Sequence, residues 1–260
     1  MTVVLPKGGN VLLSDEAPGI EGIRIGLGWS DGPGAATVEL DGVVIVVEGA
    51  APCSRVLLAH QVPNPTERLG TPPPPARPLT GDAEKLVVTL AAVPAEVSRL
   101  QFGAVIYNAA ARRQTFQSVR GAYIRLLNHA DSREIVRYTL EAETGRETAM
   151  IFGEIYRHPK GWKFRAIGQG YTAGLAGVAG AGGRDIAAAH PVDVAGFLTR
   201  TSRAQTRRNV ADYLHPQPMG TPEAAPVKAP SPPPRPAPQR PAPRPVPRTG
   251  PASAPARPPV

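Results

Sequence analysis

Apolar runs of strand length, separated by turn residues, recur along the first 171 residues of the chain. The longest run, residues 148–156, is nearly uninterrupted, as expected of a strand that is buried on both faces. Residues 158–161 (HPKG) follow with turn chemistry, because proline presets φ and glycine tolerates positive φ. From Trp162 to Gln169 apolar and polar residues mostly alternate, which is the period of a strand with one solvated face. We predict a hairpin of two long strands here.

Segments upstream of this hairpin show the same features on a smaller scale. Residues 37–47 (TVELDGVVIVV) indicate either a pair of strands or one strand with a bulge at Gly42. Residues 91–99 interrupt the pattern and predict a short helix or turn. Further strands are predicted at residues 23–29, 86–90, 100–107, 123–128 and 134–140, the last two as a hairpin. Many short strands with turns at roughly 10-residue spacing predict an all-β fold, mainly an antiparallel β-sandwich.

The pattern changes after Tyr171. Residues 172–183 (TAGLAGVAGAGG) are mostly small and predict a flexible exit from the domain. Residues 192–214 carry apolar residues near both ends and basic residues in the centre, so we predict one helix or two short ones. We expect this helical segment to pack on the sandwich with its basic face in solvent. The alternative is contact with a membrane surface or an acidic partner.

Composition separates a third region from the other two. Of the 32 prolines, 18 follow Leu214, and residues 216–260 consist largely of Pro, Ala and Arg. Such a segment cannot bury enough apolar surface to offset the entropy of ordering, so we predict a disordered tail. The predicted organisation is therefore a β-sandwich domain at residues 1–186, a basic helical segment at 187–215 and the tail at 216–260. Residues 235–241 fit the pattern R-x-x-P-x-x-P that polyproline-binding grooves recognise, so we expect protein partners at the tail or the basic segment.

The charge distribution and the cysteine content limit the kinds of partner and metal site that this chain can have. The tail holds six basic residues and one acidic residue, Glu223, so it carries +5 of the net charge of +8. The basic excess therefore belongs to the tail rather than to a face of the domain, and no specific nucleic-acid partner is expected. Contact of the tail with an anionic membrane or another polyanion remains the alternative. The single cysteine, Cys53, excludes an internal disulfide and a cysteine-based zinc site. Without a signal-peptide pattern or a long apolar run, the expected location is the cytoplasm.

Several blocks of the sequence, in order, resemble one protein family. They are KGGNV (7–11), LSDEAPG (13–19), GLGW (26–29), LTG (79–81), LAAVPAEV (90–97), IYNAAARRQTF (106–116), ETAMIFGEIYRH (147–158) and WKFRAIGQGY (162–171). The chain resembles the TerD family of tellurium-resistance and bacterial stress proteins. The resemblance implies a two-sheet sandwich, similar to calcium-binding C2-like modules, that binds calcium through acidic loops and has no established catalytic activity. Members of the family belong to bacterial stress operons linked to tellurite, phage and colicin resistance.

The acidic loops depart from the pattern that this resemblance implies. The family's D-F-D-L-D pattern is TVELD here, so Thr37 replaces one carboxylate and Glu39 lengthens another. The dense acidic loop after LTG is reduced to residues 82–85 (DAEK), and the acidic position after Ile-Tyr is an asparagine. Calcium prefers six to eight oxygen ligands, and its affinity falls as carboxylates are removed. Calcium is the one cofactor that the resemblance implies, in one weak site whose candidate ligands are Asp31, Glu39, Asp41, Asp82, Glu84 and Asn108.

Catalytic motifs are missing from the sequence. No histidine pair has metal-binding helical spacing, and there is no nucleophile elbow, phosphate-binding loop or dinucleotide fingerprint. We therefore expect that this protein is not an enzyme. The leading hypothesis is a non-enzymatic stress-response binding or scaffold protein with depleted calcium-binding loops. The alternative is a calcium sensor that retains one weak site and regulates a partner.

Overall fold

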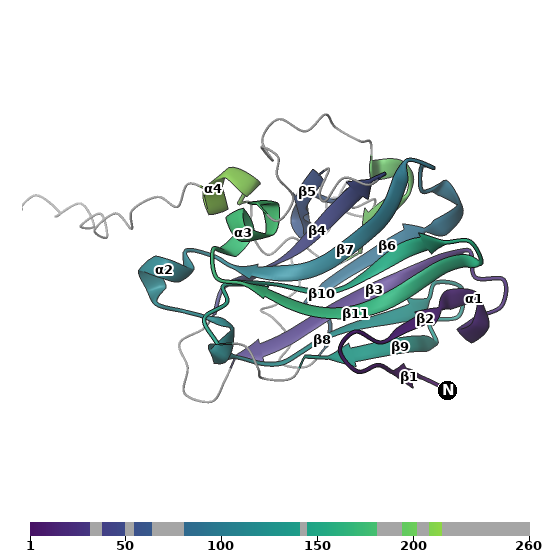
Figure 1. Ribbon diagram of the computed structural model, residues 1–260, viewed down its shortest axis with the longest axis horizontal. Helices are drawn as coiled ribbons and strands as arrows, with labels where there is room; N and C mark the ends of the chain where they lie inside the picture. The colour runs from purple at the N-terminus through teal and green to yellow at the C-terminus, as the bar shows by residue number, and fades with distance from the viewer. Residues whose placement is uncertain are drawn as a thin grey trace, which may run out of the picture. The chain divides into compact units, whose positions relative to one another are not determined.

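Two six-stranded sheets face each other in the computed structural model (Figure 1). The structure describes residues 1–31, 38–49, 55–63, 81–140, 145–180, 194–201 and 208–214. Cys53 and the predicted tail at residues 216–260 lie outside these ranges. Among the described residues, no helix is long and apolar enough to span a membrane.

The first sheet, sheet A, has the strand order β1-β9-β8-β3-β6-β12. All of its neighbouring strands are antiparallel except β1 and β9, which run parallel. Its strands are β1 (Val3–Val4), β9 (Glu134–Thr139), β8 (Val119–Asn128), β3 (Gly22–Asp31), β6 (Glu84–Thr89) and β12 (Leu198–Arg200).

The second sheet, sheet B, has the strand order β2-β11-β10-β7-β4-β5 and is antiparallel throughout. Its strands are β2 (Asn10–Leu12), β11 (Gly161–Tyr171), β10 (Ala149–His158), β7 (Val97–Ile106), β4 (Leu40–Glu48) and β5 (Arg55–Leu58). Short helices and 3₁₀ turns connect the strands of both sheets: α1 (Leu13–Glu16), η1 (Ala59–Gln61), η3 (Leu90–Ala92), α2 (Ala109–Arg112), η4 (Phe116–Ser118) and η6 (Val194–Gly196).

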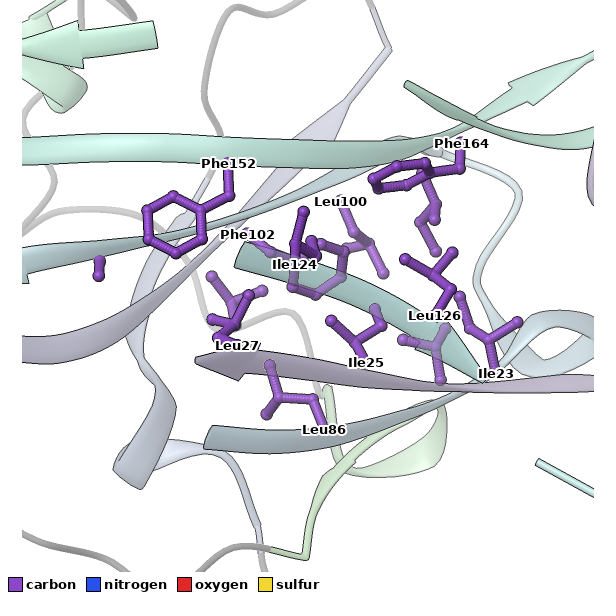
Figure 2. Close-up of a cluster of buried hydrophobic side chains, with 14 of the residues drawn as sticks. Ile23, Ile25, Leu27, Leu86, Leu100, Phe102, Ile124, Leu126, Phe152 and Phe164 are labelled. Carbon is purple, nitrogen blue, oxygen red and sulfur yellow. The ribbon is translucent and has the colours of Figure 1, made fainter. Parts of the chain in front are cut away.

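The main core lies between the sheets. Alternate residues of β3 and β8, including Ile25 and Ile124, point from sheet A toward Phe102 and Phe164 of sheet B (Figure 2). All four side chains are fully buried. Burial of these apolar side chains is the main source of the stability of the fold. Each large apolar side chain contributes about 1.5–3 kcal/mol to the free energy of folding when it is fully buried.

A second apolar cluster covers the outer face of sheet B. Val43, Ile45 and Val47 of β4 point away from the main core, because they alternate with inward residues along the strand. Two helices pack against them: α3 (Gly174–Gly180) and α4 (Val210–Leu214). Buried side chains on both faces of β4 explain its almost unbroken apolar sequence.

The N-terminal loop, residues 5–9, connects the two sheets. The backbone N–H of Leu5 donates to the carbonyl of Arg137 in β9, at 2.9 Å. Two residues past Pro6 the chain has crossed to sheet B, where Gly8 N–H donates to Ala166 O, also at 2.9 Å. Residues 1–12 therefore supply an edge strand to each sheet and the connection between them.

The structure confirms the predicted all-β sandwich and both predicted hairpins, β8–β9 and β10–β11. Three local predictions need correction. Residues 40–48 form one strand that runs straight through Gly42, and the irregularity lies at Val47/Glu48. Residues 174–180, expected to be a flexible exit, form α3, because Leu175 and Val178 find an apolar surface on sheet B.

The third correction concerns the predicted helix at residues 192–214. Among the residues of this segment that the structure describes, 194–201 and 208–214, only Val210–Leu214 is α-helical, and Leu198–Arg200 forms β12 at the edge of sheet A. Phe197 and Leu198 are buried in the main core, and the edge of β6 supplies backbone partners for this segment. Tertiary pairing here overrides a weak local helical pattern.

Candidate functional site

The predicted ligands Glu39 and Asp41 lie at the start of β4. Leu40 points into the main core, so Asp41 points to the outer face of sheet B. The carbonyl oxygen of Glu39 accepts a hydrogen bond from the N–H of Tyr107, at 2.8 Å, which brings the end of β7 beside both carboxylates. We call Glu39, Asp41 and Tyr107 the acidic-aromatic site.

Arg208 occupies this site. Its Nη1 donates to Asp41 Oδ2 at 2.9 Å, and its Nη2 donates to Glu39. The guanidinium carbon lies 3.8 Å from the centroid of the Tyr107 ring, a cation–π arrangement. Arg112 of α2 makes a second ion pair with Glu39, at 2.6 Å. Two cations thus neutralise the two carboxylates from within the chain.

Tyr213 of α4 also contacts the acidic-aromatic site. Its hydroxyl donates to Asp41, and its ring packs edge-on against Tyr107 at 5.5 Å between centroids. Burial and the Asp41 charge raise the pKa of Tyr213, which keeps the phenol protonated as a donor. Burial alone would lower the pKa of Arg208, but its hydrogen bond to Asp41 and the Asp41 charge outweigh burial and raise it. Both groups therefore hold their hydrogen-bonding forms at neutral pH.

The predicted ligand Asp82 lies in a different place, on the outer face of sheet A. Its carboxylate takes two hydrogen bonds from Arg125, both at 2.8 Å, and one from Tyr123 Oη at 2.9 Å. Tyr123 and Arg125 alternate along β8 with the inward residue Ile124, which fixes their outward direction. A hydrogen-bonded bidentate pair of this kind leaves Asp82 few free lone pairs for a metal.

Charge pairs extend this second cluster across β9. Glu134 accepts from Arg137 at 2.8 Å and from Arg125 at 3.1 Å, and the Arg137 guanidinium lies 4.5 Å from the Tyr123 ring centroid. The hydrogen bond from Arg137 lowers the pKa of Glu134, although burial opposes the shift. Burial and the hydrogen bond to Asp82 raise the pKa of Tyr123 to about 12. The cluster is a neutral network of two carboxylates and two guanidinium groups.

The other three predicted ligands, Glu84, Asn108 and Asp31, lie at separate positions in the sandwich. Glu84 starts β6, is 4 % exposed and lies against Gly42, where a Cβ would stand 2.7 Å from Glu84 Cγ. Asn108 follows Tyr107 in the left-handed region, with φ 51°, and precedes α2. Asp31 ends β3 opposite Val119.

The six candidates therefore do not form a single cluster. Asp41 and Asp82 point to opposite outer faces of the sandwich, and Glu84 lies between the sheets. Among the described residues, no three carboxylate, histidine or cysteine side chains gather as a group able to hold a metal ion. The closest association of predicted ligands is Glu39 with Asp41, joined through Arg208.

Sequence reasoning missed the side chains that contact the carboxylates. Arg208 is one of the basic residues of the predicted helical segment, and Tyr213 is one of the apolar residues near its end. Their separation from Asp41 by more than 160 positions leaves no local signal. The sequence does contain one indication. Several acidic positions of the family pattern carry other residues in this chain, and the segment that follows the sandwich domain is rich in basic residues.

Comparison with known proteins shows the family of the sandwich domain. The TerD domain matches residues 1–181, which contain both sheets except β12 and exclude Arg208 and α4. The tellurium resistance protein TerD of Serratia marcescens is 40% identical over 186 residues, covering 68% of this chain and 95% of that protein. General stress protein 16U of Bacillus subtilis is 36% identical over 188 residues, covering 69% and 96%. A crystal structure of a homologue of the telluride resistance protein from Streptomyces coelicolor aligns with TM-score 0.42 and 20% identity over 59% of this chain and 91% of that chain. The chain belongs to the TerD domain family, whose named members include tellurium resistance and general stress proteins.

Proposed function

We propose that this protein is a non-enzymatic binding or scaffold protein of the stress response, in which arginines of the chain itself replace metal ions at the acidic loops. The family gives the stress context, since relatives are named for tellurium resistance and general stress. Its expected setting is the bacterial cytoplasm, and its expected partners are proteins that bind the basic segment or the proline-rich tail.

One observation carries this proposal: the Arg208 guanidinium lies between Glu39 and Asp41 and over Tyr107. A divalent cation at this place would have to displace a cation already hydrogen-bonded to both carboxylates. Asp41 is 4 % exposed, so leaving it without a cation would carry a large desolvation cost. The guanidinium removes that cost, and the site does not need a metal to be stable.

A calcium sensor is the second candidate, because part of the predicted ligand set lies together. Glu39 and Asp41 already converge on one positive charge, and Asn108 is adjacent to Tyr107. Two carboxylates and one amide oxygen are fewer ligands than calcium prefers. Binding in this case would be weak and would compete directly with Arg208.

Calorimetric titration of the full chain with Ca²⁺, with Mg²⁺ as the control ion, tests both candidates. We expect no saturable heat below about 1 mM, the weak end of protein calcium sites. Arg208→Met keeps the aliphatic stem and removes the competing charge, so any latent calcium affinity should become measurable in this variant and disappear in Arg208→Met/Asp41→Asn. Saturation in the micromolar range by the unmodified chain would contradict the proposal and establish the sensor.

A second measurement addresses the stress role itself. The gene for the full chain is expressed in a tellurite-sensitive bacterium, and survival is scored against tellurite concentration. Under the proposal, Asp41→Asn leaves any gain in tolerance unchanged, because no metal at this site is required. Loss of the gain in that variant, with normal expression, would favour a metal-dependent role.

A further inference from the structure

A cavity of about 390 Å³ opens where the two sheets meet beside the N-terminal loop. Tyr138, Thr139 and Leu140 line it from the β9 side, and Met150, Gly168 and Gly170 line it from β10 and β11. The remaining lining residues are Leu5, Pro6, Lys7 and Glu147. This volume lies in the usual range of small-molecule sites, roughly 300–1,000 Å³. The cavity is separate from both carboxylate clusters described above.

The wall formed by the N-terminal loop is rigidly placed. Leu5 donates a backbone hydrogen bond to Arg137 of β9, and Gly8 and Gly9 exchange two backbone hydrogen bonds with Ala166 of β11, both at 2.9 Å. Because the loop is hydrogen-bonded to both sheets, this wall of the cavity is in place before a ligand binds. A preformed cavity reduces the entropic cost of binding a ligand.

Two glycines of β11 let polar side chains reach this cavity. A Cβ on Gly170 would stand 2.2 Å from Glu147 Cγ. A Cβ on Gly168, whose φ is +62°, would stand 2.3 Å from the Tyr138 hydroxyl and 3.6 Å from Lys7 Cδ. Larger residues at either position would push these side chains out of place. The G-Q-G sequence at residues 168–170 therefore shapes the cavity.

Glu147 is the unusual group in the lining. Its Oε2 is buried and has no hydrogen-bond partner, and within the described ranges Glu147 forms no ion pair. A buried carboxylate oxygen without a donor is costly, and native proteins seldom leave one unsatisfied without a functional reason. The missing partner must be a hydrogen-bond donor, most favourably a cationic one.

Lys7 supplies the complementary charge. It is exposed at the rim of the cavity, and it takes part in no ion pair within the described part of the chain. Lys7 and Glu147 thus face one cavity without pairing with each other. Leu5, Leu140 and Met150 are apolar residues of the same lining.

We propose that this cavity binds a small aliphatic zwitterion, such as a free amino acid with a branched or linear apolar side chain. The ligand's ammonium group donates to Glu147, its carboxylate pairs with Lys7, and its side chain lies against Leu5, Leu140 and Met150. This site goes beyond the proposed function and does not depend on it. Ligand binding here would give a stress protein of this family a metabolite to sense.

Three probes of similar shape test the zwitterion class on the full, unmodified chain: L-leucine, 4-methylpentanoate and 3-methylbutylamine. The second lacks the ammonium group, and the third lacks the carboxylate. By calorimetry or ligand-observed NMR, we expect L-leucine to bind at least tenfold more tightly than either analogue. Absence of saturable binding by all three probes overturns the proposal, and so does equal binding of L-leucine and the amine.

Variants then assign the two charges. Glu147→Gln should weaken L-leucine binding at least tenfold while leaving the unfolding temperature unchanged or raised, because it removes the negative charge from a carboxylate whose buried Oε2 has no hydrogen-bond partner. Lys7→Met should weaken L-leucine but leave 3-methylbutylamine unchanged. The exposed residues Glu96 and Lys160 provide matched controls, Glu96→Gln and Lys160→Met, which should bind normally. Wild-type affinity in Glu147→Gln contradicts the assignment.

Discussion

Gly28 and Tyr123 lie opposite each other on β3 and β8, and a Cβ on Gly28 would stand 2.2 Å from the Tyr123 ring. Gly26, two residues earlier on the same face, leaves the same kind of space for the Asp82 carboxylate, at 2.5 Å. The glycines of the GLGW block therefore make room for the polar network on sheet A. They are not there for backbone flexibility, since both have ordinary extended conformations.

Replacing Gly28 with alanine should destabilise the protein by about 2 kcal/mol, because a methyl group inserted at this distance forces the Tyr123 ring out of its place. The free energy of unfolding in urea measures the effect. In the Tyr123→Ala background the same change should cost less than about 0.5 kcal/mol, because the obstructing ring is gone. Equal costs in the two backgrounds would show that the ring is not the cause.

Removing the charge of Asp82 should also destabilise the fold. Asp82→Asn leaves Arg125 without its bidentate partner and weakens the bond from Tyr123, so we expect a loss of about 2 kcal/mol. Chemical denaturation at neutral pH provides the measurement. Asp15→Asn is the matched control, because Asp15 is exposed on α1, and it should change stability by less than about 0.5 kcal/mol. A loss as small as that of the control would mean that the network is not stabilising.

Alkaline pH should weaken the same network through Tyr123. Its pKa is raised from 10.0 to about 12 in the folded protein, so folding favours the protonated phenol. The corresponding stability is complete below pH 10 and is lost as the pH rises through about 12. Tyr123→Phe lacks this phenol, so its unfolding free energy should fall less steeply between these pH values. Parallel pH profiles for the two proteins would contradict the assignment.

The contacts of Arg208 should hold the segment at residues 208–214 on sheet B. Arg208→Met removes the hydrogen bonds to Glu39 and Asp41, so amide hydrogen exchange in α4 should become at least tenfold faster. The two sheets should keep their protection, because the main core does not include these residues. Arg146→Met, at an exposed arginine, is the matched control and should leave the exchange in α4 unchanged.

The local pattern of apolar and polar residues was enough to predict strands in which each face has a definite environment, either core or solvent. β8 and β9 alternate cleanly because one face meets the core and the other carries the charged network, and β10 is continuous because both of its faces are covered. α3 and β12 were missed for the opposite reason. Their small or mixed residues have no strong intrinsic preference, and they adopt their structure from the neighbouring surface of sheet B or the edge of β6.

The candidate site was predictable only in part. Glu39 and Asp41 share a short stretch of chain, so their proximity followed from the sequence. Asp82 looked equivalent by its place in an acidic loop, yet the outward direction of Tyr123 and Arg125 carries it to the other face of the sandwich. The spacing of residues along the sequence does not predict on which face of a sheet the side chain of a loop residue lies. The cations that contact these carboxylates come from distant strands and from beyond the sandwich.

The arrangement of the first twelve residues also sets an order of assembly during synthesis. β1 pairs with β9 and β2 pairs with β11, so the first strands to leave the ribosome wait for partners made more than 120 residues later. Sheet B lacks part of β11 until the chain has emerged through Tyr171, and sheet A lacks β12 until the chain has emerged through Arg200. Early strands are exposed throughout this interval, and contacts between such distant segments form slowly. A nascent chain stalled before residue 161 would present an unfinished edge of sheet B to other proteins in the cell.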